Sequence, residues 1–383
     1  MDPISWDYRR WTHSWTGHAG AVRRTERATA RGDNSQRRDG TSFDTLRNMT
    51  DRSRKPAHHP LVSIITPVLN RVDTIKDTLI SVAAQTYRPI EHLLMDGGST
   101  DGTVQVIERF AESAPHVRWI SEPDSGMYEA LGRGLRMARG DIIAYINSDD
   151  LYFPWSVEVA VGELRKGCDF VYGDVAILRR GGARRTFQLQ FYPEFDARHY
   201  IHHGILAQPT VFWTRTAMDS VGGFDAGLRL LGDVDYWTRA VVAGLRFCRV
   251  DDVLALMVLH PGALSIRFEE ELQEELTRIR ASVDPHVHRP RSRVAVRVRN
   301  SIRWRRNQFA FRREGRHGSP RRWQRFIRLL HNLGVEVRGG GTLQLLLPGR
   351  FLRHRRSQQI LDAEEFERKL LTHLYAKEND ITS

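Results

Sequence analysis

The chain has 383 residues, of which 40% are hydrophobic and 27% charged, and a formal net charge of +12. This composition is typical of a globular protein, and the length allows one large α/β domain with appendages or two domains of ordinary size. The longest apolar runs are far shorter than the roughly 20 residues that span a bilayer, so no transmembrane helix is expected.

The positive charge is concentrated toward the C-terminus. Residues 1–59 hold 12 basic and 7 acidic side chains, residues 60–288 hold 23 and 31, residues 289–356 hold 20 and 2, and residues 357–383 hold 3 and 6. An acidic middle argues against a uniformly basic nucleic-acid-binding protein. The middle of the chain and the Arg-rich segment therefore need separate explanations.

The N-terminal segment, residues 1–59, is rich in Arg, Ser, Thr, Asp and Gly and lacks hydrophobic periodicity. This pattern predicts a disordered segment. Met49 begins a short polar lead into the first expected strand, and one hypothesis is that Met49 is the true start of the native protein. The intact mass of the native protein would test that hypothesis.

Two features bear on the cellular compartment. The N-terminus has no apolar stretch of the kind found in a secretory signal. Cys168 and Cys248 have neither metal-site nor redox-motif spacing. A reducing cytoplasm fits these features best.

From Leu61 onward, apolar runs alternate with amphipathic segments. Expected strands and helices alternate as follows: strand Leu61 to Pro67, helix Val72 to Gln85, strand Glu91 to Met95, a helix to Ala111 capped by Ser99 or Asp101, strand Val117 to Ser121, helix Met127 to Ala138, and strand Asp141 to Ile146. This alternation predicts an α/β domain over residues 60–288, with a mostly parallel sheet flanked by helices. Its ligands should bind beyond the carboxyl ends of the strands.

The second half of this domain is expected to mix helices and strands. The expected elements are a helix near Val157 to Arg165, strands near Phe170 to Leu178 and Gln208 to Thr214, and a helix near Asp233 to Ala243. Residues 179–207 include a stretch that is typical of a β-hairpin. We expect that hairpin to lie over the site.

Three acidic loops contain Asp96, the pair Asp149 and Asp150, and the pair Asp233 and Asp235. Carboxylates beside glycines at strand ends suit two tasks, gripping ribose hydroxyls and holding a hard divalent cation. A nucleotide diphosphate needs such a cation, because the metal neutralises charge on the leaving phosphate. Any one Asp alone could equally be a turn former or a helix cap. Three such loops in order favour a functional site.

The stretch from Leu61 to about Leu264 resembles a family 2 glycosyltransferase with the nucleotide-diphospho-sugar transferase (GT-A) fold. The resemblance covers roughly half of the chain and depends on motifs in a fixed order. These are SIITPVLNR (63–71), MDGGSTDGT (95–103), SEPDSGMYEALGRG (121–134), ARGDIIAYINSDD (138–150), QPTVFW (208–213), GGFD with GDVDYWTRA (222–240), and HPGALS (260–265). The resemblance implies a Rossmann-like GT-A domain that takes a nucleoside-diphosphate-sugar as donor.

The resemblance also implies which side chains bind the donor nucleotide. Pro67 and Asn70 sit where the first strand meets the base, Asp96 matches an aspartate that contacts base or ribose, and Asp124 lies in the next loop on the sugar-nucleotide side. Asp149 is expected to face the ribose.

The resemblance further implies a divalent cation, Mg²⁺ or Mn²⁺. Asp150 occupies the position of the better metal ligand, and His260 matches a histidine that completes the metal or diphosphate site.

Asp233 occupies the position of the family's catalytic aspartate. As a general base it would accept a proton from the acceptor hydroxyl in a single displacement that inverts the anomeric carbon. Asp235 is the rival base. At the start of a helix the two side chains diverge by about 200°, so only one can face the acceptor.

The sequence departs from the family pattern at three positions. Glu129 and Gly132 replace the usual Asp and Asn, and Gly232 replaces the usual acidic residue before the catalytic Asp. These changes leave the donor contacts near residues 129–133 open. His202 and His203 precede the QPT motif and could either line the acceptor pocket or fill structural hydrogen-bond positions.

Residues 289–383 are expected to form a basic, mainly helical extension. Apolar residues recur at helical spacing at Trp323, Phe326, Ile327, Leu330 and Leu333, with arginines toward the remaining surface. Such a helix suits an anionic membrane surface, and residues 290–356 would provide that contact. The alternative is a helix packed on the catalytic domain with a solvated Arg face.

Nucleic acid is a third interpretation of the arginines. We do not expect it, because no nucleic-acid-binding motif accompanies the charge. The tail after Gln358 is predicted to contain a short amphipathic helix that includes Leu370 and Leu374.

Taken together, the sequence predicts an inverting, metal-dependent glycosyltransferase that acts on a glycan or lipid-linked glycan acceptor in cell-surface polysaccharide biosynthesis. It would be cytoplasmic and peripheral on the inner face of the plasma membrane. The alternative is a catalytically silent GT-A scaffold or binding module that acts through the Arg-rich segment.

Overall fold

A computed structural model describes the central domain and parts of the C-terminal extension. The described residues are 59–180, 186–192, 194–197, 200–201, 206–260, 268–283, 325, 329, 336–338, 344–346 and 368–376. The expected disorder of residues 1–58 and the hypothesis that Met49 is the start both concern residues outside this set, as do the predictions for His202 and His203.

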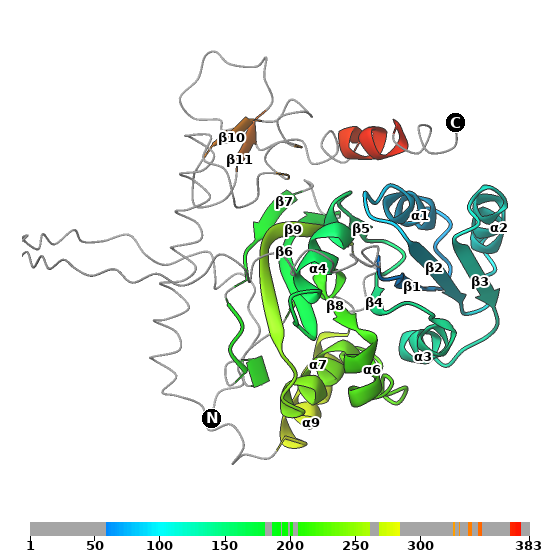
Figure 1. Ribbon diagram of the computed structural model, residues 1–383. Helices are drawn as coiled ribbons and strands as arrows, with labels where there is room; N and C mark the ends of the chain where they lie inside the picture. Colours follow the sequence, from blue (N-terminus) through cyan, green and yellow to red (C-terminus); the bar gives the residue numbers. More distant parts are fainter. Residues whose placement is uncertain are drawn as a thin grey trace, which may run out of the picture. The chain divides into compact units, whose positions relative to one another are not determined.

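The described part of the chain is built on a nine-stranded sheet with the order β3-β2-β1-β4-β8-β6-β9-β5, and β7 pairs with β6 (Figure 1). Four parallel strands form its first half: β1 (Val62–Val68), β2 (Ile90–Asp96), β3 (Val117–Ser121) and β4 (Ile142–Tyr145). All seven residues of β1 and of β2 are buried, as expected for central strands of a parallel sheet.

The second half of the sheet is mixed. Its strands are β5 (Leu151–Tyr152), β6 (Phe170–Arg179), β7 (Thr186–Gln190), β8 (Phe212–Thr214) and β9 (Phe247–Leu259). β8 runs antiparallel to β4 and β6, whereas β6 and β9 are parallel. The predicted hairpin is present, because β6 and β7 are antiparallel neighbours.

Helices cover both faces of the parallel half. Leu94 of β2 packs in one cluster with α1 (Ile75–Ala83) and α2 (Thr103–Ser113), whereas its neighbour Leu93 packs in another with α3 (Met127–Met137). Adjacent side chains of a strand point to opposite faces, so α3 lies across the sheet from α1 and α2 (Figure 1).

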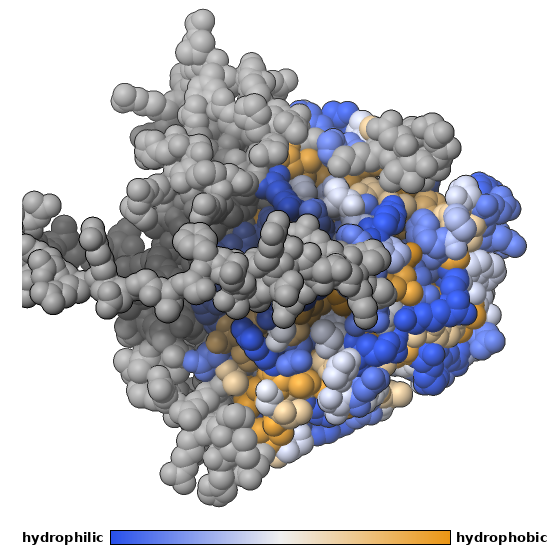
Figure 2. Space-filling model, in the orientation of Figure 1, coloured by the Kyte–Doolittle hydropathy of each residue, from blue (hydrophilic) through white to orange (hydrophobic). Residues whose placement is uncertain are grey.

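The remaining helices belong to the mixed half. They are α4 (Ser156–Leu164), the 3₁₀ turn η1 (Gln208–Thr210), α6 (Arg215–Val221), α7 (Gly232–Val242) and α9 (Glu269–Ala281). Hydrophilic residues cover the visible face around α2 and α3, whereas hydrophobic residues gather toward α7 and α9 (Figure 2). Each strand and helix predicted between Leu61 and Ala243 is present, except that the first three residues of the strand predicted from Gln208 to Thr214 form the 3₁₀ turn η1. The predictions missed β5, β9, α6 and α9.

The helix cap after β2 differs from the expectation. Gly102, with φ 100°, occupies the N-cap position of α2. Asp101 Oδ1 nevertheless accepts hydrogen bonds from the N–H and the hydroxyl of Thr103. Gly102 adopts the left-handed backbone conformation, and the Asp101 carboxylate accepts from the Thr103 N–H in the first turn of α2.

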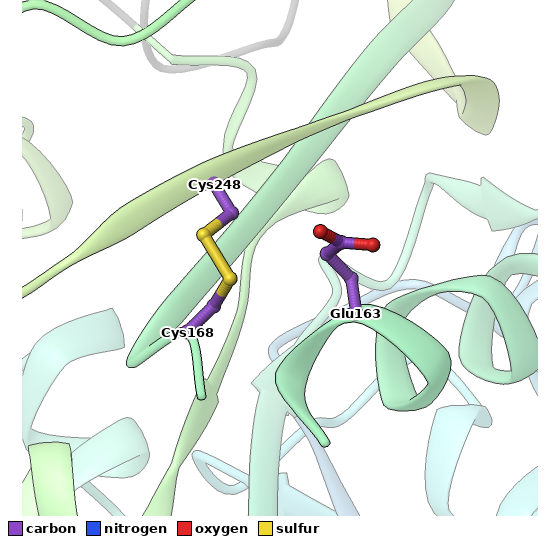
Figure 3. Close-up of side chains that lie close together, drawn as sticks. All are labelled: Glu163, Cys168 and Cys248. Atoms are coloured by element: carbon purple, nitrogen blue, oxygen red, sulfur yellow. A yellow bond between two sulfur atoms is a disulfide. The ribbon is translucent and has the colours of Figure 1, made fainter. Parts of the chain in front are cut away.

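Cys168 and Cys248 form a disulfide that joins the starts of β6 and β9, which the sequence analysis did not anticipate (Figure 3). Disulfides persist mainly in oxidising compartments, so this bond counts against the reducing cytoplasm that we expected. The carboxylate of Glu163 lies beside the two sulfurs. Because the sulfurs are bonded to each other, they do not form a thiolate metal site with it.

The described parts of the C-terminal extension include both helix and strand. β10 (Glu336–Arg338) and β11 (Gln344–Leu346) form an antiparallel pair, and residues 368–376 are helical. Leu370 and Leu374 are buried in the main core, so the predicted tail helix is a packing helix.

Leu329, from the segment predicted to meet a membrane, is also buried in the main core. Arg325 of the same segment donates to Glu158 at 2.9 Å. These two residues agree with the alternative of a helix packed on the domain. Within the described residues, no helix is both long enough and apolar enough to cross a membrane.

Candidate active site

The loops after β1 and β2 meet at one edge of the sheet. The register pairs Pro67 with Met95 and Val68 with Asp96, which places the predicted residues Pro67, Asn70 and Asp96 together. Asn70 adopts a positive φ of 53°. Its side-chain oxygen accepts from the N–H of Thr100 at 2.9 Å, so the loop after β1 is bonded to the loop after β2.

The Asp96 carboxylate is buried and shapes its own loop. Oδ2 accepts from the N–H groups of Gly98 (3.0 Å) and Ser99 (2.9 Å) and from the hydroxyl of Ser121 (2.7 Å). Oδ1 accepts from the hydroxyl of Ser99 at 2.5 Å. Because four hydrogen-bond donors bind the two carboxylate oxygens, Asp96 holds the loop in one rigid shape.

Asp124 reaches the same place from the loop after β3. A Cβ atom on Gly97 would lie 2.7 Å from Asp124 Oδ2, so the absence of a side chain at Gly97 lets the carboxylate approach β2. Burial raises the pKa of Asp124, and the charge of Asp96 adds to this effect. The two carboxylates therefore share one region at the ends of β2 and β3.

The loop after β4 carries Asp149, which faces His260. Asp149 Oδ2 lies 3.0 Å from His260 Nε2, and both side chains are partly exposed. His260 follows directly after the last residue of β9. The structure therefore brings together two predicted site residues from distant parts of the chain.

Asp150, the next residue, points into the protein. Its Oδ1 accepts from the N–H of Val258 at 2.8 Å, and its backbone carbonyl accepts from the Thr78 hydroxyl at 2.9 Å. Burial raises the pKa of Asp150 well above its usual value, with a further rise from the charge of Asp149. Asp150 thus ties the loop to β9 and α1.

Asp233 is the second residue of α7 and is partly buried. Its Oδ1 accepts from the N–H of Val234 at 2.8 Å and lies 3.4 Å from the Tyr128 hydroxyl. Burial raises the pKa of Asp233 to about 6, which outweighs the lowering effect of these hydrogen bonds. Asp233 is therefore ionised at neutral pH but more basic than an ordinary aspartate.

Asp235, the rival base, is engaged in an ion pair. The guanidinium of Arg239 donates to Asp235 Oδ2 at 2.8 Å and also to the carbonyls of Val221 and Gly223. This arrangement holds Asp235 against the end of α6, away from Tyr128. The geometry favours Asp233 as the available carboxylate.

Aromatic side chains connect the Asp233 region with the loop after β4. The ring of Phe224 packs against Tyr128 and Tyr145, at centroid distances of 5.8 and 5.6 Å. Burial raises the pKa of Tyr145, and the charges of Asp233 and Asp150 add to the rise. The packing of Phe224 against both tyrosines links the surroundings of Asp233 with the end of β4, which leads into the loop that carries Asp149 and Asp150.

The glycine that replaces the usual acidic residue has a packing reason. A Cβ atom on Gly232 would lie 2.7 Å from ring atoms of Tyr128, which is almost fully buried. Glu129, another departure, accepts from the N–H and hydroxyl of Ser125 at the start of α3. Both changes are accounted for by local structure.

Sequence reasoning missed two residues beside Asp233. Tyr128 lies inside a recognised motif but was not singled out, and Glu275 lies on α9 outside every motif. The signal for Tyr128 is an aromatic residue with a hydroxyl in a glycine-rich helix. Nothing in the sequence around Glu275 distinguishes it from the other glutamates of that helix.

Comparisons with known proteins agree on a family. Residues 63–223 match the family model "Glycosyl transferase family 2". A PGL/p-HBAD biosynthesis glycosyltransferase from Mycobacterium bovis is 29% identical over 185 residues, which are 47% of this chain and 69% of the relative. The uncharacterized glycosyltransferase YibD of Escherichia coli is 32% identical over 97 residues, 25% of this chain and 28% of that protein.

Two solved structures show a weaker likeness. TarS of S. aureus has a TM-score of 0.46 and 19% identity, and the match covers 57% of this chain and 39% of TarS. The mannosyltransferase PcManGT from Pyrobaculum calidifontis, solved with GDP-Man and Mn²⁺, has a TM-score of 0.42 and 22% identity, and covers 53% of this chain and 57% of that one. Over residues 63–223 this chain is therefore similar to family 2 glycosyltransferases, and its similarity to curated glycosyltransferases supports a transferase enzyme.

Proposed function

We propose that the enzyme transfers a sugar from a nucleoside-diphosphate-sugar to a glycan or lipid-linked glycan acceptor, with inversion and with help from a divalent cation. One observation carries this proposal: the partly buried Asp233, whose pKa lies near 6, shares its aromatic surroundings with the loop that bears Asp149 and Asp150. A base near an anion-handling loop suits a displacement at a carbon that carries a diphosphate.

Asp233 would act as the general base. Its carboxylate would accept the proton of the acceptor hydroxyl while that oxygen forms a bond to the anomeric carbon. The bond between the anomeric carbon and the diphosphate oxygen breaks in the same step, and the electron pair leaves with the nucleoside diphosphate. Attack from the face opposite the leaving group inverts the anomeric configuration.

The residues present fit a divalent cation at Asp149 and His260. Their ligand atoms are 3.0 Å apart, the separation of two neighbouring ligands of an octahedral ion with bonds of about 2.1 Å. Both side chains are partly exposed, so phosphate oxygens and water could complete the ligand set. When bound, Mg²⁺ or Mn²⁺ would neutralise the charge that develops on the leaving diphosphate.

Asp150, which we first expected to bind the metal, would instead hold the loop. Its hydrogen bond from Val258 and the bond from Thr78 to its carbonyl fix the position of Asp149. We therefore assign Asp149 and His260 as metal ligands and Asp150 as their support.

The donor nucleotide would bind along the loops after β1, β2 and β3. Asn70 and Asp96 fix the shapes of the first two loops, and Asp124 adds a partly exposed carboxylate beside Gly97. Pro67 would border the base at the end of β1. Rigid loops of this kind lower the ordering cost of binding a flexible ligand.

For the acceptor side, we propose a role in cell-surface polysaccharide biosynthesis, with the basic residues 290–356 in contact with an anionic membrane surface. The 20 basic and 2 acidic side chains of residues 289–356 support this proposal, whereas the buried Leu329 and the ion pair of Arg325 with Glu158 favour packing on the domain. The proposed location is the cytoplasmic face of the plasma membrane, and the disulfide between Cys168 and Cys248 counts against it. Alkylation of protein from rapidly acidified cells would test it, because a disulfide between Cys168 and Cys248 in all the protein would contradict a reducing compartment.

Thermal unfolding with a panel of donors tests the catalytic proposal. The panel contains UDP-, dTDP- and GDP-sugars, each with Mn²⁺, Mg²⁺ or EDTA. A donor at about 100 times its dissociation constant should stabilise the protein by about 2.7 kcal/mol, and EDTA should reduce that gain. Folded protein that responds to no donor would overturn the proposal and favour a scaffold that acts through its Arg-rich segment.

A further inference from the structure

Glu275 of α9 has a buried carboxylate that accepts three backbone hydrogen bonds. Oε1 accepts from the N–H of Arg229 at 2.7 Å, and Oε2 accepts from those of Leu230 (3.0 Å) and Leu231 (2.8 Å). Three consecutive N–H groups point at one anion, and hydrogen bonds to a charged acceptor are stronger than neutral ones. Glu275 therefore fixes the shape of this turn.

The turn leads directly to Asp233. Leu231 is the N-cap residue of α7, and Asp233 follows two residues later. The Leu230 carbonyl accepts from the Tyr128 hydroxyl at 3.0 Å, and the same hydroxyl lies 3.4 Å from Asp233 Oδ1. A hydroxyl has one hydrogen, so the place of the Leu230 carbonyl decides how fully Tyr128 donates to Asp233.

We infer that Glu275 is a positioning residue for the base Asp233. Its carboxylate holds residues 229–231 so that α7 begins at the right place and the Tyr128 hydroxyl is directed to Leu230, which leaves the Asp233 carboxylate available for the acceptor proton. This inference rests on the proposed role of Asp233.

Two further observations agree with it. The guanidinium of Arg229 lies over the ring of Phe268 at 4.2 Å, so the turn has a second anchor beside α9. The negative charge of Glu275 also contributes to the raised pKa of Asp233, after the larger effect of burial. A loss of Glu275 would therefore weaken both the placement and the basicity of Asp233.

The experiment compares Glu275→Gln with Glu274→Gln, an exposed glutamate next to it on the same helix. Glutamine keeps the size of the side chain, but its amide N–H₂ opposes a backbone N–H where a carboxylate oxygen had accepted. Release of nucleoside diphosphate is measured from UDP-, dTDP- and GDP-sugars with Mn²⁺. We expect kcat to fall by about 10²-fold in Glu275→Gln, because small misplacements cost that much, with KM for the donor unchanged. Glu274→Gln should match the wild type.

A double variant separates positioning from a general structural role. If Glu275 acts through Asp233, then adding Glu275→Gln to Asp233→Asn should not lower turnover further. If Glu275→Gln lowers kcat by the same factor in the wild type and in Asp233→Asn, the inference is overturned. Glu275→Asp, which keeps the charge with a shorter reach, serves if Glu275→Gln does not fold, and it should show a smaller loss of kcat.

The outcomes also distinguish this inference from the proposed function. Wild-type kcat in folded Glu275→Gln, together with an inactive Asp233→Asn, would overturn the inference and leave the proposed function intact. Wild-type turnover in Asp233→Asn would overturn the proposed function itself and the inference with it.

Discussion

The Asp149 carboxylate lies 3.0 Å from Nε2 of His260, although 111 residues separate them in the sequence. The contact forms because β5, just after Asp149, pairs with β9, just before His260. The neighbouring Asp150 accepts from the N–H of Val258 on the same strand. One aspartate thus supports the loop, while the other makes a partly exposed polar contact with a histidine.

The first prediction concerns this division of roles. Asp149→Ala should abolish the metal-dependent part of donor binding, because it removes one of two protein ligands. Asp150→Asn should keep it, since an asparagine oxygen can still accept from Val258. Isothermal titration with Mn²⁺ and donor measures both. Loss of metal-dependent binding in Asp150→Asn with retention in Asp149→Ala would restore the original assignment.

The second prediction is a pH dependence of turnover. The pKa of Asp233 is raised to about 6, and only the ionised form can accept a proton. Turnover should therefore be full above that value and decline as pH falls through it, by about tenfold at one unit below. Rates measured in buffers from pH 5 to pH 8, with unfolding curves at each pH, check this. A flat profile in folded protein would exclude Asp233 as the base.

The third prediction concerns the glycine before Asp233. In Gly232→Ala the new methyl group would lie 2.7 Å from the buried Tyr128 ring, so the start of α7 must shift. Overpacking of this kind costs about 1–3 kcal/mol, and we expect lower turnover as well. Gly223→Ala is the control, because nothing lies within 4 Å of its Cβ position. Equal melting temperatures and rates for the two variants would contradict this packing argument.

The fourth prediction concerns the disulfide. Cys168 and Cys248 are 80 residues apart in the sequence, and closing a loop of that size stabilises a fold by about 4.5 kcal/mol in the chain-entropy model. Reductant should therefore lower the melting temperature of the wild type but not that of the Cys168→Ser/Cys248→Ser double variant. An unchanged melting temperature of the wild type in reductant would show that the bond is absent or contributes nothing.

The parallel half of the fold could be predicted because its pattern is local. β1 and β2 consist mostly of apolar residues, and turn residues separate them from amphipathic helices. β9 was missed because Asp251 and Asp252 interrupt its apolar pattern. The structure shows how these charges are accommodated: Arg249 bonds to both Asp251 and the buried Asp174 of β6. Asp174 lies 75 residues before Arg249 in the sequence, so no local pattern reveals it as a partner.

The site was predictable in its residue types but not in their directions. Motif order brought Asp149, Asp150 and His260 into consideration, yet the N–H of Val258 determines which aspartate faces outward. Similarly, the choice between Asp233 and Asp235 depends on Arg239, which pairs with Asp235. Glu275 could not be found, since its partners are backbone groups 44–46 residues away.

The most direct test of the account is the turnover number of Asp233→Asn beside that of Asp235→Asn, with the donor that protects the wild type. We predict that Asp233→Asn lowers kcat by about 10²–10⁴-fold with little change in donor affinity, whereas Asp235→Asn remains active. An active Asp233→Asn together with an inactive, folded Asp235→Asn would contradict the account and make Asp235 the base.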